Sequence, residues 1–205
     1  PPISNGSERT TSSLGVDLSQ AYGYYRGQKL SIERIQNEFP ALSAKAYQAQ
    51  LRFELAHKGS YLAVEKELRK MIGEKWPTYK KQMLQRLSSG LGTTQITAEQ
   101  ANTFIRTVNL RTKGQIQTPI LETLLTYNPE FQRNPAAEML RGYKETYRTN
   151  GHAKARGVDF QIEYPRSWKH KEGKRPHVIK LFTSENGRGQ DSVLLMVKDI
   201  PLPSG

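Results

Sequence analysis

The chain has 205 residues and a mass of 23.3 kDa, and with 36% hydrophobic and 24% charged residues it is long enough to bury a core. It contains no cysteine, which excludes disulfides, iron–sulfur clusters, thiolate zinc sites and cysteine nucleophiles. No apolar run reaches the roughly 18 residues of a membrane-spanning helix. A total of 31 Lys and Arg against 19 Asp and Glu gives a net charge of +12.

The positive charge is densest in residues 150–180, which hold eight Lys or Arg and three Asp or Glu. Such an excess favours a polyanionic partner, which is a nucleic acid, an anionic lipid surface, an acidic glycan or an acidic protein. The alternative is a positive surface that only keeps the protein soluble.

The N-terminal two-thirds of the chain has helical periodicity. Residues 1–16 are rich in Ser, Thr, Pro and Gly and predict a flexible leader without secondary structure. Residues 17–142 predict a helical domain of seven or eight amphipathic helices. We expect Tyr22, Tyr24 and Tyr25 in its first helix to be core residues, because Tyr supplies apolar area with a polar tip.

Gly and Pro residues divide this region into helices. Tyr47, Leu51 and Leu55 recur every fourth residue and predict an apolar stripe on a helix that ends near Gly59. Ser60 is expected to cap the next helix. Later helix starts are marked by Trp76-Pro77, a capping box over residues 97–100, Thr118-Pro119 and Asn134-Pro135.

Beyond Gly142 the apolar period changes from 3.6 to 2, so residues 143–205 predict an antiparallel β region. Strands are expected within residues 143–149, 158–164, 178–182 and 193–197, with Asn186-Gly187 as a hairpin turn. The fold class is therefore α+β, an N-terminal multi-helix region followed by a small antiparallel sheet of three to four strands. Helices cover one side of that sheet, and more helix, a partner chain, a second copy or sequence beyond residue 205 would cover the other.

The string GVDFQIEYPRSW at residues 157–168 is an alternating strand that ends in Tyr-Pro-x-x-Trp before a basic loop and a second strand. It resembles the opening strands of PsbP-like domains, and the likeness covers residues 157–199. That resemblance implies a truncated domain of an exported or lumenal, generally non-catalytic family. The whole chain also looks like uncharacterised bacterial exported proteins, which implies a periplasmic or secreted location with a signal peptide outside the given sequence.

The basic connections on either side of the strand at residues 158–164 form the candidate binding site. Its residues are Lys154, Arg156, Arg166, Trp168, Lys169, Lys171, Lys174 and Arg175. Charge together with aromatic stacking could hold a phosphate, a glycan sulfate or a single-stranded base. Because the two connections flank one strand, the cations either converge or lie at opposite ends. The alternative is a solvated loop with Trp168 in the core.

No catalytic or metal-binding pattern emerges. His152, His170 and His177 match no compact metal-ligand spacing, and the chain has no Gly-x-Ser-x-Gly nucleophile elbow. The sequence therefore predicts no catalytic residue, no metal and no cofactor. Its leading interpretation is a non-enzymatic exported bacterial protein that binds an unknown protein or anionic ligand. The alternative is a nucleic-acid or polyanion binder that uses residues 150–180, and a hydrolase with helix carboxylates is a third hypothesis.

Overall fold

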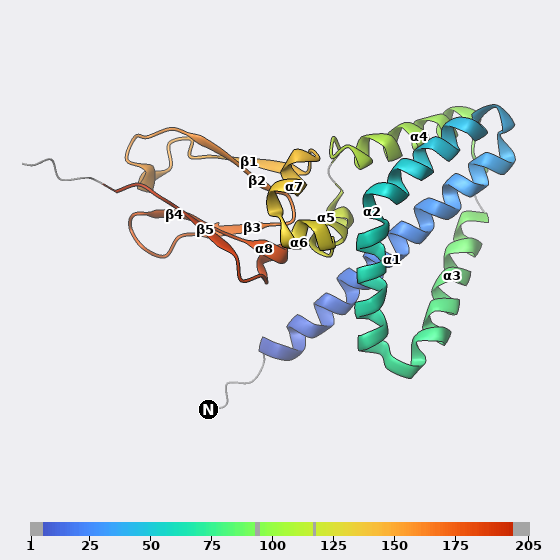
Figure 1. Cartoon of the computed structure of the whole chain (residues 1–205), viewed down its shortest axis with the longest axis horizontal. Coiled ribbons are helices and arrows are strands. Elements are labelled where there is room, and N and C mark those ends of the chain that lie inside the picture. Colours follow the sequence, from blue (N-terminus) through green and yellow to red (C-terminus); the bar gives the residue numbers. More distant parts are fainter. Residues whose placement is uncertain (1–5, 93–94, 117, 199–205) are drawn as a thin grey trace, which may run out of the picture. The chain divides into compact units, whose positions relative to one another are not determined.

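A computed structural model describes residues 6–92, 95–116 and 118–198 of the chain (Figure 1). They fall into two compact units that divide between Arg133 and Asn134. The first unit is helical and the second carries the strands, which confirms the α+β class. None of the described helices is both long and apolar enough to span a bilayer.

The first unit is built from helices whose apolar faces meet in one core. Two neighbouring helices, α1 and α2, stack Tyr25 on Tyr61 with ring centroids 4.2 Å apart, and Tyr22 meets Trp76 edge-on at 5.5 Å. Tyr22 and Tyr25 are buried, as expected. The elements are α1 (Gly6–Glu38), η1 (Pro40–Leu42), α2 (Ser43–Ile72), η2 (Gly73–Lys75), α3 (Trp76–Gly92), α4 (Ala98–Thr112), α5 (Pro119–Thr126) and α6 (Pro129–Arg133).

Helix α1 corrects the expected leader. Residues 6–16 of the predicted leader are helical, and residues 1–5 lie outside the described residues. A Cβ added at Gly15 would lie 3.3 Å from the Met71 methyl carbon, so α1 closely approaches the end of α2 there. The hydroxyl of Ser19 also donates to the Gly15 carbonyl at 2.7 Å. The helix therefore extends into this polar segment despite its low helix propensity.

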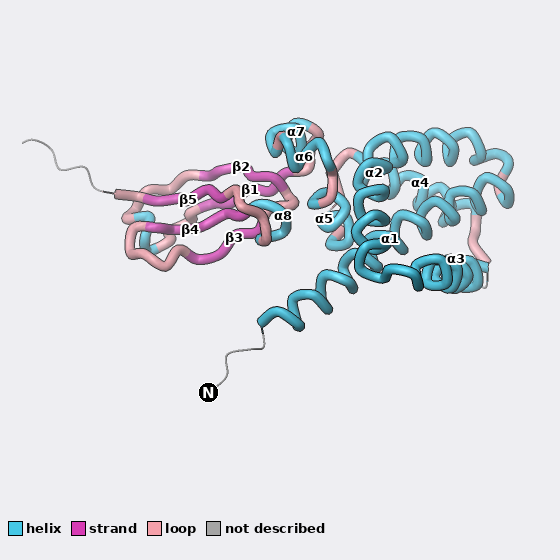
Figure 2. The backbone as a smooth tube through the Cα atoms, turned by 60° about the horizontal axis from the view of Figure 1, so that its bottom comes forward, coloured by secondary structure: helices cyan, strands magenta, loops and turns pink. Residues whose placement is uncertain are grey.

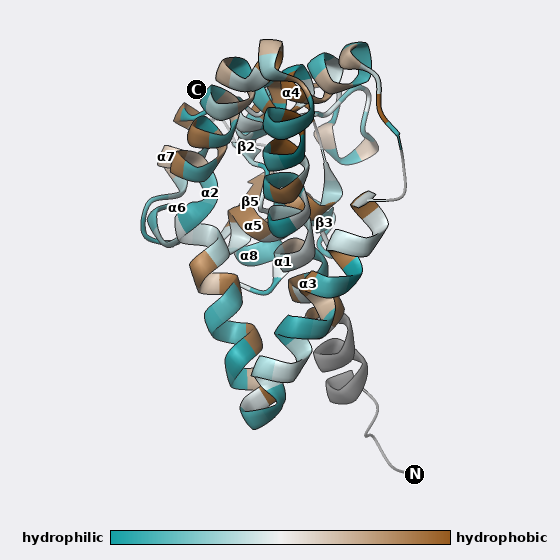
Figure 3. Cartoon of the chain, turned by 90° about the vertical axis from the view of Figure 1, so that its right-hand side faces the viewer, coloured by the Kyte–Doolittle hydropathy of each residue, from teal (hydrophilic) through white to brown (hydrophobic). Residues whose placement is uncertain are grey.

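Helix α2 corrects the predicted break at Gly59 and Ser60, because it runs unbroken through both residues. Its buried face carries Ala46, Ala49, Phe53, His57, Ser60, Tyr61, Val64, Glu65 and Leu68. The expected apolar stripe lies outside this face, since Tyr47, Leu51 and Leu55 are 60%, 45% and 76% exposed. Small Ala and Ser side chains share this buried face with the large side chains of Phe53, Tyr61 and Leu68. Figure 3 shows hydrophobic and hydrophilic residues on different sides of the helices.

The described part of the second unit, residues 134–198, contains five strands in two antiparallel sheets, where the sequence predicted one sheet of three to four strands. The first sheet pairs β1 with β2, and the second has the order β3-β4-β5. The elements are α7 (Pro135–Leu140), β1 (Lys144–Arg148), η3 (Ala153–Ala155), β2 (Gln161–Pro165), β3 (Lys169–Glu172), β4 (Val178–Thr183), α8 (Ser184–Gly187) and β5 (Ser192–Met196). Helix α7 thus belongs with the strands, although the sequence grouped it with the helices.

The two sheets lie face to face within this unit (Figure 2). Phe182 of β4 sits between them, with ring centroids 4.8 Å from Tyr164 of β2 and 5.9 Å from Tyr147 of β1. Strands β4 and β5 pair in antiparallel fashion across α8, where Asn186 and Gly187 adopt φ of 57° and 85°. This geometry confirms the predicted hairpin turn.

Candidate functional site

The structure separates the predicted basic site into two groups. Arg166 and Trp168 lie in the connection between β2 and β3, and Lys169 is the first residue of β3. The second group, here called the hairpin group, consists of Lys154, Lys171, Lys174 and Arg175. It lies at the other end of β3, around the connection to β4. Arg156 follows η3 in a left-handed conformation and is exposed.

Arg166 is largely buried and hydrogen-bonded within the second unit, and its assignment to the binding site stays a prediction. The residue is only 8% exposed. Its Nε donates to the Glu145 carboxylate at 2.9 Å, and Nη2 donates to the Lys144 carbonyl at 3.3 Å. Trp168 is half-buried beside it. A guanidinium held in this way would have to give up both hydrogen bonds to turn toward a ligand.

Within the hairpin group, Lys154 is paired with the carboxylate of Glu172, which Lys180 and His152 also contact. Lys180 and Lys154 lie 2.7 and 3.1 Å from its oxygens, and His152 Nε2 lies 3.1 Å away. The hydrogen bonds from Lys180 and Lys154 lower the pKa of Glu172 to about 2. Lys154 also donates to the Gly173 carbonyl at 2.6 Å. Part of the positive charge here is therefore balanced within the protein, whereas Lys171, Lys174 and Arg175 line an open cavity of about 430 Å³.

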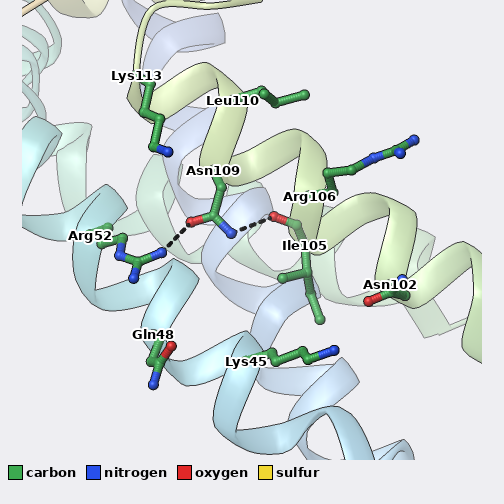
Figure 4. Close-up of a pocket in the computed structure, with 9 residues that line it drawn as sticks. All are labelled: Lys45, Gln48, Arg52, Asn102, Ile105, Arg106, Asn109, Leu110 and Lys113. Carbon is green, nitrogen blue, oxygen red and sulfur yellow. Dashed lines mark hydrogen bonds between the residues drawn. The ribbon is translucent and has the colours of Figure 1, made fainter.

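A second cationic site, which the sequence did not predict, lies between α2 and α4 (Figure 4). This α2–α4 groove has a volume of about 450 Å³. Lys45, Gln48 and Arg52 lie on α2 at helical spacing, so they share one face of that helix. The remaining lining residues come from α4 and the residue that follows it. They are Asn102, Ile105, Arg106, Asn109, Leu110 and Lys113.

One cation of the groove, Arg52, is held in place by a hydrogen-bonded side chain of α4. Arg52 Nη1 donates to the Asn109 side-chain oxygen at 3.3 Å, and the Asn109 amide donates to the Ile105 carbonyl at 3.2 Å. Figure 4 shows Arg52, Asn109 and Lys113 gathered at one end, while Arg106 extends from α4 away from α2. Among the described residues no carboxylate lines this groove, and none pairs with its four cations. The groove therefore offers hydrogen-bond donors and positive charge to an anion.

Each unit holds a buried titratable group with a shifted pKa, Glu138 in the second unit and His57 in the first. The Glu138 carboxylate of α7, 1% exposed, accepts hydrogen bonds from the Ser167 backbone N–H at 2.8 Å and from the Ser167 hydroxyl at 2.6 Å. Burial raises the pKa of Glu138 to about 7, although the Ser167 bonds oppose the shift. Burial lowers the pKa of His57 in α2 to about 4. Both side chains are almost fully buried, so we assign neither to a binding site.

The described residues hold no group of three or more His, Asp or Glu side chains that could bind a metal ion. The comparisons with known proteins gave no match, whether to a family model, to a curated protein or to a solved structure.

Proposed function

We propose that the protein acts by binding, and that the α2–α4 groove holds a polyanion through its phosphate or sulfate groups. The observation that carries this proposal is the composition of the groove, in which four cations meet no carboxylate among the described residues. In the hairpin group, by contrast, Glu172 already neutralises part of the charge. The α2–α4 groove is therefore the better site for a partner with many negative charges.

The dimensions of the groove suit a chain of anions. From Asn102 to Lys113 the α4 side extends about 16 Å, and from Lys45 to Arg52 the α2 side extends about 10 Å. Three or four phosphates of a nucleic-acid strand can contact the cations over this length. None of the described residues that line the groove is aromatic, so we expect recognition of the backbone rather than stacking on bases.

The test measures binding of a fluorescent single-stranded oligonucleotide against salt concentration. Each neutralised phosphate of a single strand contributes about −0.7 to the slope of log affinity against log salt, so the groove predicts a slope of about −2 to −3. Replacing Arg52 and Lys113 by Ala should reduce its magnitude by about 1.4. The matched control replaces Lys66 and Lys70 of the same helix, which are exposed and lie outside the groove, and should leave the slope unchanged.

Two outcomes would reject this site. Equal slopes in the groove variant and the control variant would mean that net charge alone governs binding. A reduced slope only in a Lys171→Ala plus Lys174→Ala variant would place the polyanion on the basic segment at residues 150–180. That segment is the site favoured by the sequence.

We also propose export from the cytoplasm, which rests on the likeness to bacterial exported proteins. Fractionation of the producing cell tests it directly, because full-length protein found only in the cytoplasm would reject export.

A further inference from the structure

The outer face of the three-stranded sheet carries a partly exposed apolar surface formed by Leu181, Leu194 and Met196, here called the apolar floor. Phe182 points toward the other sheet, where it contacts Tyr147 and Tyr164, so its neighbour Leu181 points to the opposite face. Leu194 of β5 pairs with Leu181 in register and lies on the same face. Leu194 is 52% exposed, and Met196, two residues further along β5, is 46% exposed. Together these side chains form an apolar patch that the described part of the chain leaves open.

Cations border this floor along one side. Lys171 of β3 pairs with Leu181 in register, and Lys174 and Arg175 follow in the connection to β4. They line the same cavity of about 430 Å³ as Leu181, Leu194 and Met196. Glu172 is the one carboxylate among its lining residues, and it is bound by Lys154 and Lys180, neither of which lines the cavity. The three cations at the rim are therefore left to meet an external negative charge.

The backbone of the hairpin fixes this arrangement. The Gly173 N–H donates to the Ile179 carbonyl at 3.1 Å. A Cβ at Gly173 would lie 2.2 Å from the Val178 carbonyl oxygen, so only glycine permits the close approach of the connection to β4. Lys174 and Arg175 are thereby held at the edge of the floor.

We propose that this cavity binds a single-chain anionic amphiphile, with its alkyl chain on Leu181, Leu194 and Met196 and its phosphate or carboxylate head beside Lys171, Lys174 and Arg175. A cavity of this volume is within the range that holds small-molecule ligands. A polyanion without an alkyl chain would leave the apolar floor in water, and a neutral lipid would leave the cations without a partner. Because the cavity has an apolar part and a cationic part, it favours a ligand that has both an alkyl chain and a negatively charged head. The proposal does not depend on the α2–α4 groove.

Methyl-labelled methionine in the full chain provides the test. The protein has four Met residues, and Met196 alone lines the cavity, so Met71, Met83 and Met139 report on binding elsewhere. Decyl phosphate below its micelle concentration should shift the Met196 methyl resonance saturably and leave the other three in place. Inorganic phosphate should not shift Met196, and decyl glucoside, which has a neutral head, should bind about tenfold more weakly.

Variants separate the charged and apolar parts of the site. Lys174→Ala plus Arg175→Ala should weaken decyl phosphate binding about tenfold. The control removes Lys144 and Arg148, two cations on exposed positions of β1, and should change affinity less than twofold. Leu194→Asn should abolish the saturable shift, while the unchanged Met71, Met83 and Met139 resonances show that the chain remains folded.

Three results would overturn the proposal. Equal shifts of all four methionines would indicate unspecific partition into apolar surface. Equal affinity of the cation variant and its control would show that the head group is not bound by Lys174 and Arg175. A Met196 shift that depends on protein concentration without any amphiphile would identify a second copy of the chain as the occupant. Because none of these readouts involves Arg52 or Lys113, the outcome is independent of the test of the α2–α4 groove.

Discussion

Glu138 should make the second unit less stable at neutral pH than at mildly acidic pH. Burial raises its pKa to about 7 in the folded protein, compared with an ordinary value of 4.5 in the unfolded chain. Between these values the folded state binds more protons than the unfolded state, so stability falls as pH rises from 4.5 to 7. A difference of about 2.5 pKa units corresponds to a loss of about 3 kcal/mol.

The informative variant is Glu138→Gln. The amide is neutral at every pH, its oxygen can accept the Ser167 N–H, and its NH₂ can donate to the Ser167 hydroxyl. We therefore expect the variant to lose the decline in stability between pH 4.5 and 7 and to be more stable than the wild type above pH 7.

Urea unfolding followed by Trp168 fluorescence provides the assay. The chain has two Trp residues, and Trp76 belongs to the first unit, so a Trp76→Phe background isolates the signal of the second unit. The free energy of unfolding is measured from pH 4 to pH 8 with and without Glu138→Gln. Identical pH profiles of the two proteins, or a wild-type stability that rises over this range, would show that burial does not raise the pKa of Glu138.

Three further predictions concern other elements of the chain. Burial lowers the pKa of His57 to about 4 in the folded protein, compared with 6.5 in the unfolded chain, so the free energy of unfolding of the first unit should fall by about 3 kcal/mol between pH 6.5 and pH 4. The variant His57→Leu should not show this part of the decline when unfolding is followed by Trp76 fluorescence. Gly173→Ala should destabilise the second unit by about 1 to 3 kcal/mol in urea unfolding because its Cβ collides with Val178, whereas Gly90→Ala in α3 should be neutral or stabilising. Thr97→Ala should cost the first unit about 1 kcal/mol in the same assay, since it removes the hydrogen bond from the Gln100 N–H; an unchanged midpoint would show that the cap contributes nothing.

Local signals in the sequence predicted those parts of the fold that depend on neighbouring residues. The capping box at Thr97 and Gln100 is present with both hydrogen bonds, and Asn186-Gly187 forms the turn between β4 and β5. The change of period near Gly142 predicted the transition from helices to strands. These features need no information on distant parts of the chain.

Errors arose where long-range packing decided the outcome. Gly59 was interpreted as a helix end, but it lies inside α2, where a Cβ would lie 3.7 Å from Pro129 of α6. That is an ordinary van der Waals distance, so Gly59 is neither a turn nor a position where packing requires glycine. Strand β3 escaped prediction because its residues, Lys169–Glu172, are all polar and exposed. Backbone pairing with β4 holds this strand in place, and its sequence lacks the alternation of apolar and polar residues that would predict a strand.

The α2–α4 groove was missed because its residues belong to helices about fifty positions apart in sequence. One signal was nevertheless available, since no Asp or Glu occurs between Glu38 and Glu54 or between Glu99 and Glu122. Both acid-free stretches contain Lys and Arg, and both line the groove. The sequence named the cations of the hairpin group, but their separation from Arg166 depends on which end of β3 each connection reaches.

Because α2 is one unbroken helix about 45 Å long, the directions in which its side chains point are fixed relative to one another. Arg52 in its first half faces the groove, and Glu65 in its second half accepts from Lys80 of α3 at 2.9 Å. One residue inserted between them would rotate all later side chains of the helix by about 100°, so Arg52 could no longer face the groove while Glu65 faces Lys80. Length changes between Arg52 and Glu65 should therefore be poorly tolerated, both in evolution and in protein engineering.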